Sequence, residues 1–99
     1  MILGKVIGTI WSTRKDENLV GAKFLIVQQL DVNFNHKDST VIAIDSVGAG
    51  VGEIVLVAQG SSARQTAFTK NKPVDAVIMA IVDKLDITIK EKIKELVSQ

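Results

Sequence analysis

The chain has 99 residues and a mass of 10.7 kDa, the size of one domain. Hydrophobic residues make up 46% of it, which excludes a disordered chain. The formal net charge of +1 supplies little long-range attraction for nucleic acid or anionic lipid, and the absence of cysteine excludes disulfides, thiolate metal sites and thiol catalysis.

Five short strands are predicted from runs of β-branched and other apolar residues bounded by polar or glycine-containing segments. They are expected at residues 2–11, 21–30, 40–44, 53–58 and 76–82. The first contains Gly4 and Gly8, and a glycine inside a strand usually marks a bend, a bulge or a close backbone approach. Residues 31–39 are predicted to form a polar loop, which carries the only histidine, His36.

Two short helices are also predicted. One begins after Gly60, where Ser62 and Gln65 have the spacing of a capping box. The other lies in the C-terminal tail, where Thr88 and Glu91 have the same spacing. The tail carries an apolar stripe at helical spacing, formed by Ile89, Ile93, Leu96 and Val97. A helix of about ten residues is too short to be stable alone in water, so this stripe is expected to dock.

The fold class predicted from these elements is mainly β: a small, five-stranded, OB-like β-barrel. Its short helix would lie between strands 4 and 5, whereas OB barrels usually place it between strands 3 and 4. Closure of the sheet would remove the exposed edges of the short strands. We expect a single domain over residues 1–99, with the barrel at 1–86 and a C-terminal helical tail at 87–99.

The glycine-rich segment at residues 48–53 resembles a phosphate-binding loop only superficially. A dinucleotide fingerprint needs Gly-x-Gly-x-x-Gly opening a helix, but here the third glycine comes one residue early and a strand follows. Two interpretations remain. The segment is either a tight turn that needs positive φ, or a place where bare backbone lets another chain approach closely.

The residues needed for catalysis are missing. Ser61 and Ser62 would need a base, and nothing in the sequence places His36 near them, whereas helix capping accounts for both serines. No cluster of metal-ligating residues is visible. We therefore predict no catalytic residue, no metal and no cofactor.

Arg64 stands in the first turn of the predicted helix, where a cation is disfavoured by ~0.3–1 kcal/mol. Such a residue often has a specific partner, and Glu53 is one candidate carboxylate. An exposed arginine with its stem lying on the barrel is the alternative, and local physics favours neither.

Three stretches carry a family resemblance. The first is Met-x-x-Gly-x-Val-x-Gly at residues 1–8, followed by Trp11 and Thr13. The second is Leu-x-Gly-x-Lys-Phe-Leu-Ile-Val-Gln at residues 19–28. The third joins Asp-Ser-Val-Gly-Ala-Gly-Val-Gly-Glu at residues 45–53 to Gly-Ser-Ser-Ala-Arg at residues 60–64. Together they resemble the pentameric vertex proteins of bacterial microcompartment shells, a family that includes the carboxysome vertex protein.

This resemblance implies a structural function without catalysis. Five copies would form a cyclic homopentamer that caps a shell vertex in the bacterial cytoplasm. Its partners would be hexameric shell proteins, with no nucleic acid and no membrane. The implied subunit-interface residues are Gly48, Ala49, Gly50, Gly52, Glu53, Gly60, Ser61, Ser62 and Arg64. The alternative is an OB-type barrel module that binds an oligonucleotide or a small ligand.

Overall fold

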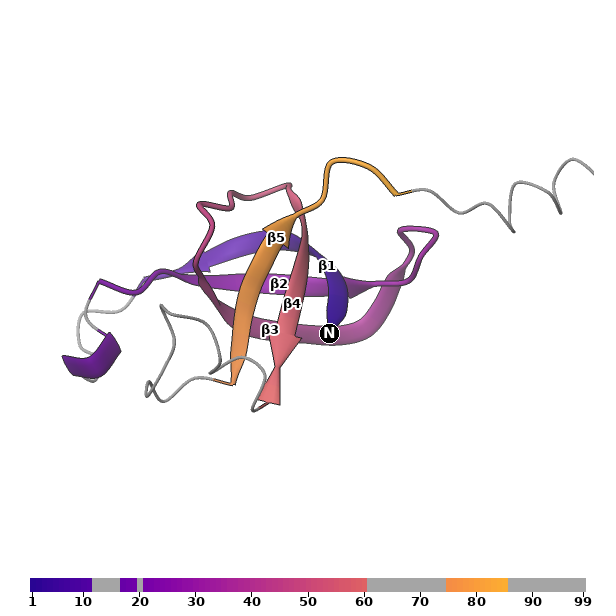
Figure 1. Ribbon diagram of the computed structural model, residues 1–99. Helices are drawn as coiled ribbons and strands as arrows, with labels where there is room; N and C mark the ends of the chain where they lie inside the picture. Colours follow the sequence, from indigo (N-terminus) through magenta and orange to yellow (C-terminus); the bar gives the residue numbers. More distant parts are fainter. Residues whose placement is uncertain (12–16, 20, 61–74, 86–99) are drawn as a thin grey trace, which may run out of the picture.

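The computed structural model describes residues 1–11, 17–19, 21–60 and 75–85 of the chain. These residues form five strands and one short 3-10 helix (Figure 1). The elements are β1 (Ile2–Ile10), η1 (Glu17–Leu19), β2 (Phe24–Leu30), β3 (His36–Asp45), β4 (Ile54–Gln59) and β5 (Ala76–Ile81).

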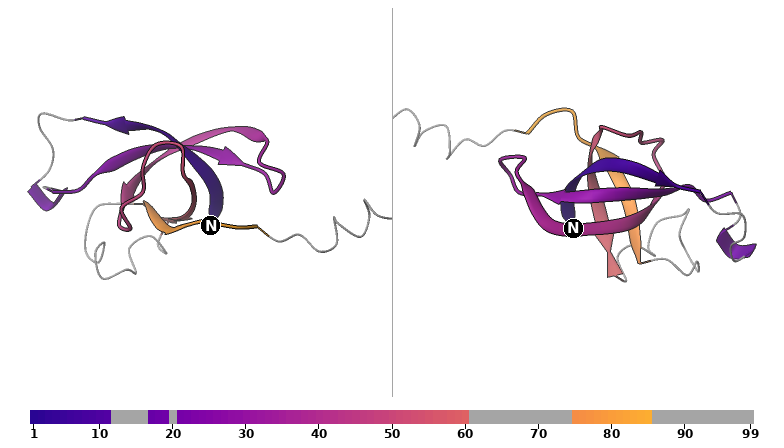
Figure 2. Two further views of the ribbon diagram at one scale, coloured as in Figure 1. Left: turned by 90° about the horizontal axis from the view of Figure 1, so that it is seen from above. Right: turned by 180° about the vertical axis from the view of Figure 1, so that it is seen from behind.

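The strands close into a barrel in the order β1-β2-β3-β5-β4 (Figures 1 and 2). Four of the five neighbouring pairs are antiparallel. The parallel pair is β3 with β5, joined at Ile44–Val77 and Asp45–Ile78 alone. The predicted five-stranded barrel is therefore confirmed. It forms because the apolar positions that alternate along each short strand are buried together in one interior.

The third strand is longer than predicted. The polar loop expected at residues 31–39 is wrong in its second half, since β3 begins at His36. Across the irregular register between Gln28 and Leu30, the side-chain Nε2 of Gln28 donates hydrogen bonds to the backbone oxygens of Lys37 and Ser39. The Gln28 side chain thus helps to pair the polar start of β3 with β2, and the polar sequence of this segment did not indicate a strand. The helices predicted at residues 60–65 and 88–97 lie outside the described residues, Gly60 excepted.

The barrel interior is filled by aliphatic side chains from all five strands. Its fully buried members include Val6, Leu25, Val27, Val55, Val57 and Ile78. Gly4 also faces this interior from β1. A Cβ at Gly4 would lie 2.3 Å from Cγ1 of Val27 and 2.9 Å from the backbone oxygen of Gln28. The close approach that the sequence predicted inside the first strand is confirmed at Gly4.

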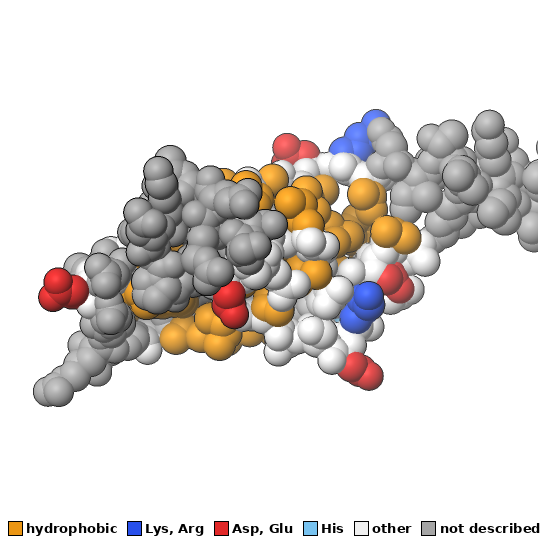
Figure 3. Space-filling model, turned by 60° about the horizontal axis from the view of Figure 1, so that its bottom comes forward, with side chains coloured by type: hydrophobic (Ala, Val, Ile, Leu, Met, Phe, Trp, Pro, Cys, Tyr) orange, Lys and Arg blue, Asp and Glu red, His pale blue; other side chains and the backbone are white. Residues whose placement is uncertain are grey.

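A β-bulge interrupts β1. The register with β2 shifts between Val6 and Gly8, so Ile7 is the extra residue and its side chain is exposed. Bulges typically re-aim a side chain in this way. Seen from below, hydrophobic side chains gather in several groups on the barrel surface (Figure 3). The core of one chain therefore buries only part of its apolar side chains.

Candidate subunit-contact site at the glycine turn

The connection from β3 to β4 contains the three glycines of the candidate site. Gly48 and Gly52 have φ of 78° and 95°, values that L side chains rarely adopt. Gly50 has no such φ, and a Cβ placed there would meet only Oε1 of Glu53, at 3.4 Å. The tight-turn interpretation is therefore confirmed for two of the glycines and leaves the third unexplained by the chain's own backbone.

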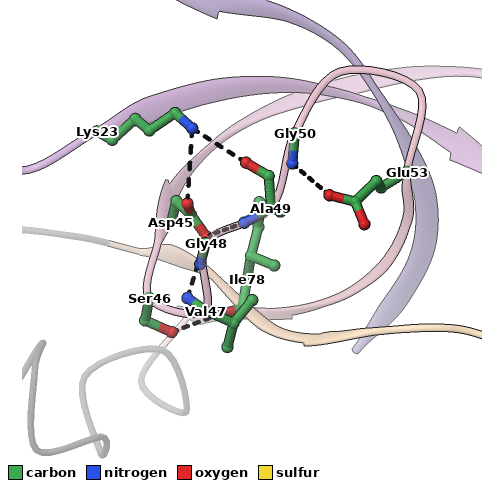
Figure 4. A network of polar contacts seen from close by, with 9 residues as sticks. All are labelled: Lys23, Asp45, Ser46, Val47, Gly48, Ala49, Gly50, Glu53 and Ile78. Carbon is green, nitrogen blue, oxygen red and sulfur yellow. Dashed lines mark hydrogen bonds and ion pairs between the residues drawn. The ribbon is translucent and has the colours of Figure 1, made fainter.

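The carboxylate of Asp45 organises the first half of the turn (Figure 4). Its side chain is almost wholly buried, and Oδ1 accepts three backbone N–H hydrogen bonds. The donors, each 3.1 Å away, are Val47, Gly48 and Ala49. This arrangement is an aspartate turn, in which the side chain substitutes for backbone acceptors. An aspartate at a strand end, two or three residues before a glycine, is the sequence signal that could have revealed it.

Lys23 closes this network from the approach to β2. Its Nζ donates a hydrogen bond to the oxygen of Ala49 at 3.0 Å and lies 3.9 Å from Oδ2 of Asp45. The Lys23 side chain is half exposed, so the ion pair itself contributes little. Its hydrogen bond, however, fixes the turn against the segment that leads into β2. Neither Lys23 nor Asp45 is among the site residues predicted from the sequence.

The second half of the turn is tied to β1. Oε1 of Glu53 accepts a hydrogen bond from the amide of Gly50 at 2.6 Å. The amide of Gly52 donates to the oxygen of Val6 at 2.8 Å, and the amide of Val6 donates to the oxygen of Glu53 at 2.9 Å. Glu53 thus has a partner within its own turn. Its predicted pairing with Arg64 remains a prediction, because Arg64 lies outside the described residues.

The turn packs one side chain into the barrel core and exposes two others to solvent. Ala49 is buried among the core residues, so its side chain faces its own barrel. The hydroxyl of Ser46 donates to the oxygen of Ile78 in β5 at 2.6 Å. Val47 and Val51 are 40% and 65% exposed. The result is a turn held against β1, β5 and the residue before β2, with two exposed valines beside its glycines.

Of the remaining predicted contact residues, Gly60 is described, and it lies away from this turn. Gly60 has φ of 65° and follows the end of β4, which is six residues long, so it stands at the far end of that strand from the turn. Ser61, Ser62 and Arg64 lie outside the described residues. Within one chain, Gly60 and the glycine turn therefore stand at opposite ends of β4.

The turn is unsuited to hold a phosphate. Three of its amides are already occupied by the Asp45 carboxylate, and the element that follows is a strand. Within residues 1–11, 17–19, 21–60 and 75–85, no three His, Cys, Asp or Glu side chains are grouped to bind a metal ion. In the same part of the chain, no helix has the length and apolarity needed to cross a membrane.

Comparison with known proteins matches the barrel and its glycine turn to one protein family. A family model described as "Ethanolamine utilisation protein EutN/carboxysome" matches residues 1–83. The chain belongs to this family. The resemblance noted from the three sequence stretches is thereby confirmed, since the match spans all of them.

Relatives of the EutN/carboxysome family are similar over most of their length. The chain is 48% identical over 86 residues to the bacterial microcompartment shell vertex protein GrpN of Rhodospirillum rubrum, covering 87% of this chain and 97% of GrpN. The structure of the pentameric GrpN shell protein superposes with a TM-score of 0.81 at 46% identity, covering 89% of this chain and all of that one. CcmL of Nostoc sp. PCC 7120 superposes with a TM-score of 0.85 at 42% identity, covering 90% and 94%.

Proposed function

We propose that this chain forms a cyclic homopentamer that caps the vertices of a bacterial microcompartment shell. The observation that carries the proposal is the likeness to pentameric GrpN, which extends over the whole of that chain. A flat sheet of hexameric tiles cannot close on itself, and fivefold points supply the missing curvature. A small, aromatic-poor barrel with aliphatic side chains on its surface suits such a role, because part of that surface is buried between copies.

The proposed contact site between copies includes the glycine turn. Its described members are Gly48, Ala49, Gly50, Gly52, Glu53 and Gly60, and its members outside the described residues are Ser61, Ser62 and Arg64. Gly50 supports the proposal, since its lack of a side chain is required neither by φ nor by a clash with the described part of the chain. Ala49 would contribute backbone rather than side chain, because its methyl group lies in the core.

The proposed role is geometric rather than catalytic. The shell location is in the bacterial cytoplasm, the partners are hexameric shell proteins, and no cofactor, nucleic acid or membrane takes part. The barrel comprises residues 1–86, with residues 87–99 as a helical tail. The alternative, an OB-type module that binds oligonucleotide or small ligand, has less support, because stacking platforms need aromatic side chains and the sequence has only four aromatic residues.

Two measurements test the proposal. Native mass spectrometry of the purified chain is expected to give a single species of five subunits, and a monodisperse monomer at micromolar concentration would refute it. In cells that make the compartment, deletion of this chain is expected to leave shells open or elongated in electron micrographs, while the enclosed enzymes keep their activity after lysis. Retention on single-stranded nucleic acid with a steep salt dependence would favour the alternative.

A further inference from the structure

The connection between β2 and β3, residues 31–35, forms a hairpin tip with two apolar side chains. Val32 and Phe34 are 58% and 48% exposed. Phe34 has φ of 64°, a left-handed conformation that is strained for a bulky side chain. Three-residue hairpin loops usually place glycine at this position. The turn itself therefore does not account for the phenylalanine, and its exposed aromatic side chain indicates a contact beyond the turn.

Hydrogen bonds hold the hairpin tip in one conformation. Oδ1 of Asp31 accepts hydrogen bonds from the amides of Asn33, at 2.8 Å, and Asn35, at 3.0 Å. The amide of Asp31 donates to the oxygen of Asn35 at 2.9 Å, and the amide of Phe34 donates to the oxygen of Asp31 at 3.0 Å. The tip is thus ordered before it meets a partner, so a contact with its apolar side chains costs little backbone ordering.

The C-terminal tail, residues 87–99, carries an apolar surface that also needs a partner. Its sequence predicts a helix that is too short to be stable alone. The family model ends at residue 83, and the alignment with GrpN covers 97% of GrpN but 87% of this chain. The tail thus lies outside the barrel shared with these relatives. Its apolar stripe consists of Ile89, Ile93, Leu96 and Val97.

The tail begins at the same end of the barrel as the hairpin tip. In Figure 1 and in both views of Figure 2, the β2–β3 connection and the segment that follows β5 lie at one end, with η1 at the other. Only residues 86 and 87 separate Leu85, the last described residue, from Thr88, where the helix is predicted to begin. Three residue steps span about 10 Å at most, so the stripe starts close to this end.

We propose that the apolar stripe of the tail docks on Val32 and Phe34 of the same chain. The contact covers two apolar surfaces that otherwise face water. Residues 32–35 are uncharged, and the charged residues of the predicted helix can stay in water, since Glu91, Lys94 and Glu95 are off the stripe. Docking also gives the strained phenylalanine a function. The inference concerns one chain and does not depend on the proposed pentamer.

Amide hydrogen exchange of the full chain tests the docking. Amides of residues 92–97 are expected to exchange more slowly than in a synthetic peptide of residues 86–99. Phe34→Asn is expected to reduce this protection about tenfold, because asparagine tolerates the left-handed conformation but lacks the aromatic contact.

Trp11→Asn is the matched control. Trp11 is also an exposed aromatic residue, but it opens the β1–β2 connection at the η1 end of the barrel (Figure 1). This variant is expected to keep the protection of the tail. Equal exchange in the chain and the peptide overturns the proposal. The same conclusion follows if Phe34→Asn keeps full protection, or if Trp11→Asn loses as much.

Cross-linking identifies the chain to which the tail docks. The chain has no cysteine, so Asn33→Cys and Lys92→Cys combined introduce the only two thiols and leave the stripe, Val32 and Phe34 intact. A short bismaleimide is expected to link them within one chain. Glu17→Cys with Lys92→Cys is the matched control, since η1 lies at the other end of the barrel, and no link within the chain is expected.

Links between chains instead of within one would assign the stripe to a neighbouring copy and overturn docking in the same chain. Equal linking in the control pair also overturns it. Native mass spectrometry of the same samples reports the oligomeric state separately. A monomer whose tail is protected and linked to the hairpin tip contradicts the proposed function alone, whereas a pentamer with an unprotected tail contradicts this inference alone.

Discussion

A methyl group on Gly4 would collide with Val27: the two carbons would lie 2.3 Å apart, in the barrel interior. The neighbouring contact is with backbone, since the oxygen of Gln28 would be 2.9 Å away. A side-chain terminus can move aside, whereas a paired strand backbone moves only with its ladder. Among the glycines, position 4 is therefore the one at which neighbouring atoms leave no room for a side chain.

Gly4→Ala is expected to destabilise the protein by about 3 kcal/mol, because overpacking a filled core forces off-rotamer side chains and backbone shifts. Gly8→Ala is the matched control in the same strand, where the new methyl group would lie 3.4 Å or more from its nearest neighbours, all of them atoms of the Ile26 side chain. Urea unfolding at a fixed protein concentration, followed by circular dichroism, compares the two. Equal stability of both variants would show that the interior can expand at Gly4.

Asp45→Ala is expected to cost about 2–3 kcal/mol, because three turn amides lose a charged acceptor. Asp45→Asn retains one acceptor oxygen and is expected to cost less. Amide hydrogen exchange supplies the local check: protection of the amides at Val47, Gly48 and Ala49 should fall in the alanine variant. Unchanged protection at all three would mean that the carboxylate does not hold the turn.

The glycines of the turn are expected to respond differently to substitution. Gly52→Ala should destabilise the barrel by about 1 kcal/mol, because alanine is strained at a φ of 95°. Gly50→Val should leave the barrel nearly as stable, yet weaken the ring, since its backbone has no positive φ and its missing side chain is assigned to the neighbouring copy. Native mass spectrometry after serial dilution measures the second effect. A Gly50→Val ring that dissociates like the wild type contradicts the assignment.

Gln28 is expected to hold the register of the β2–β3 hairpin. Gln28→Ala removes the Nε2 donor that serves the oxygens of Lys37 and Ser39, at an expected cost of about 1–2 kcal/mol. Gln28→Glu should cost more, because a carboxylate facing those carbonyl oxygens is an acceptor without a donor. Urea unfolding ranks the three proteins. The glutamate variant would have to be at least as stable as the alanine variant to contradict this role.

The local pattern of the sequence was enough to predict five strands, a closed barrel and the family. Alternating and continuous apolar runs indicate strands, and the glycine motifs at residues 45–53 and 60–64 stand at a characteristic separation. These features depend on residues close together in the chain, so a single sequence contains them. The start of β3 at His36 was missed, because a polar strand stabilised by the Gln28 side chain has no apolar pattern of its own.

Only the tertiary structure decided which glycine serves which purpose. Gly4, Gly50 and Gly52 look alike in the sequence. Yet Gly4 is required by Val27 of the neighbouring strand, Gly52 by its own φ, and Gly50 by neither. The same holds for Asp45, whose buried carboxylate collects the amides of the turn, and for Ile42, whose side chain faces solvent although its neighbours in the sequence are buried. Each distinction depends on strand register and on closure of the sheet. These bring residues far apart in sequence within contact, and local periodicity carries no record of that pairing.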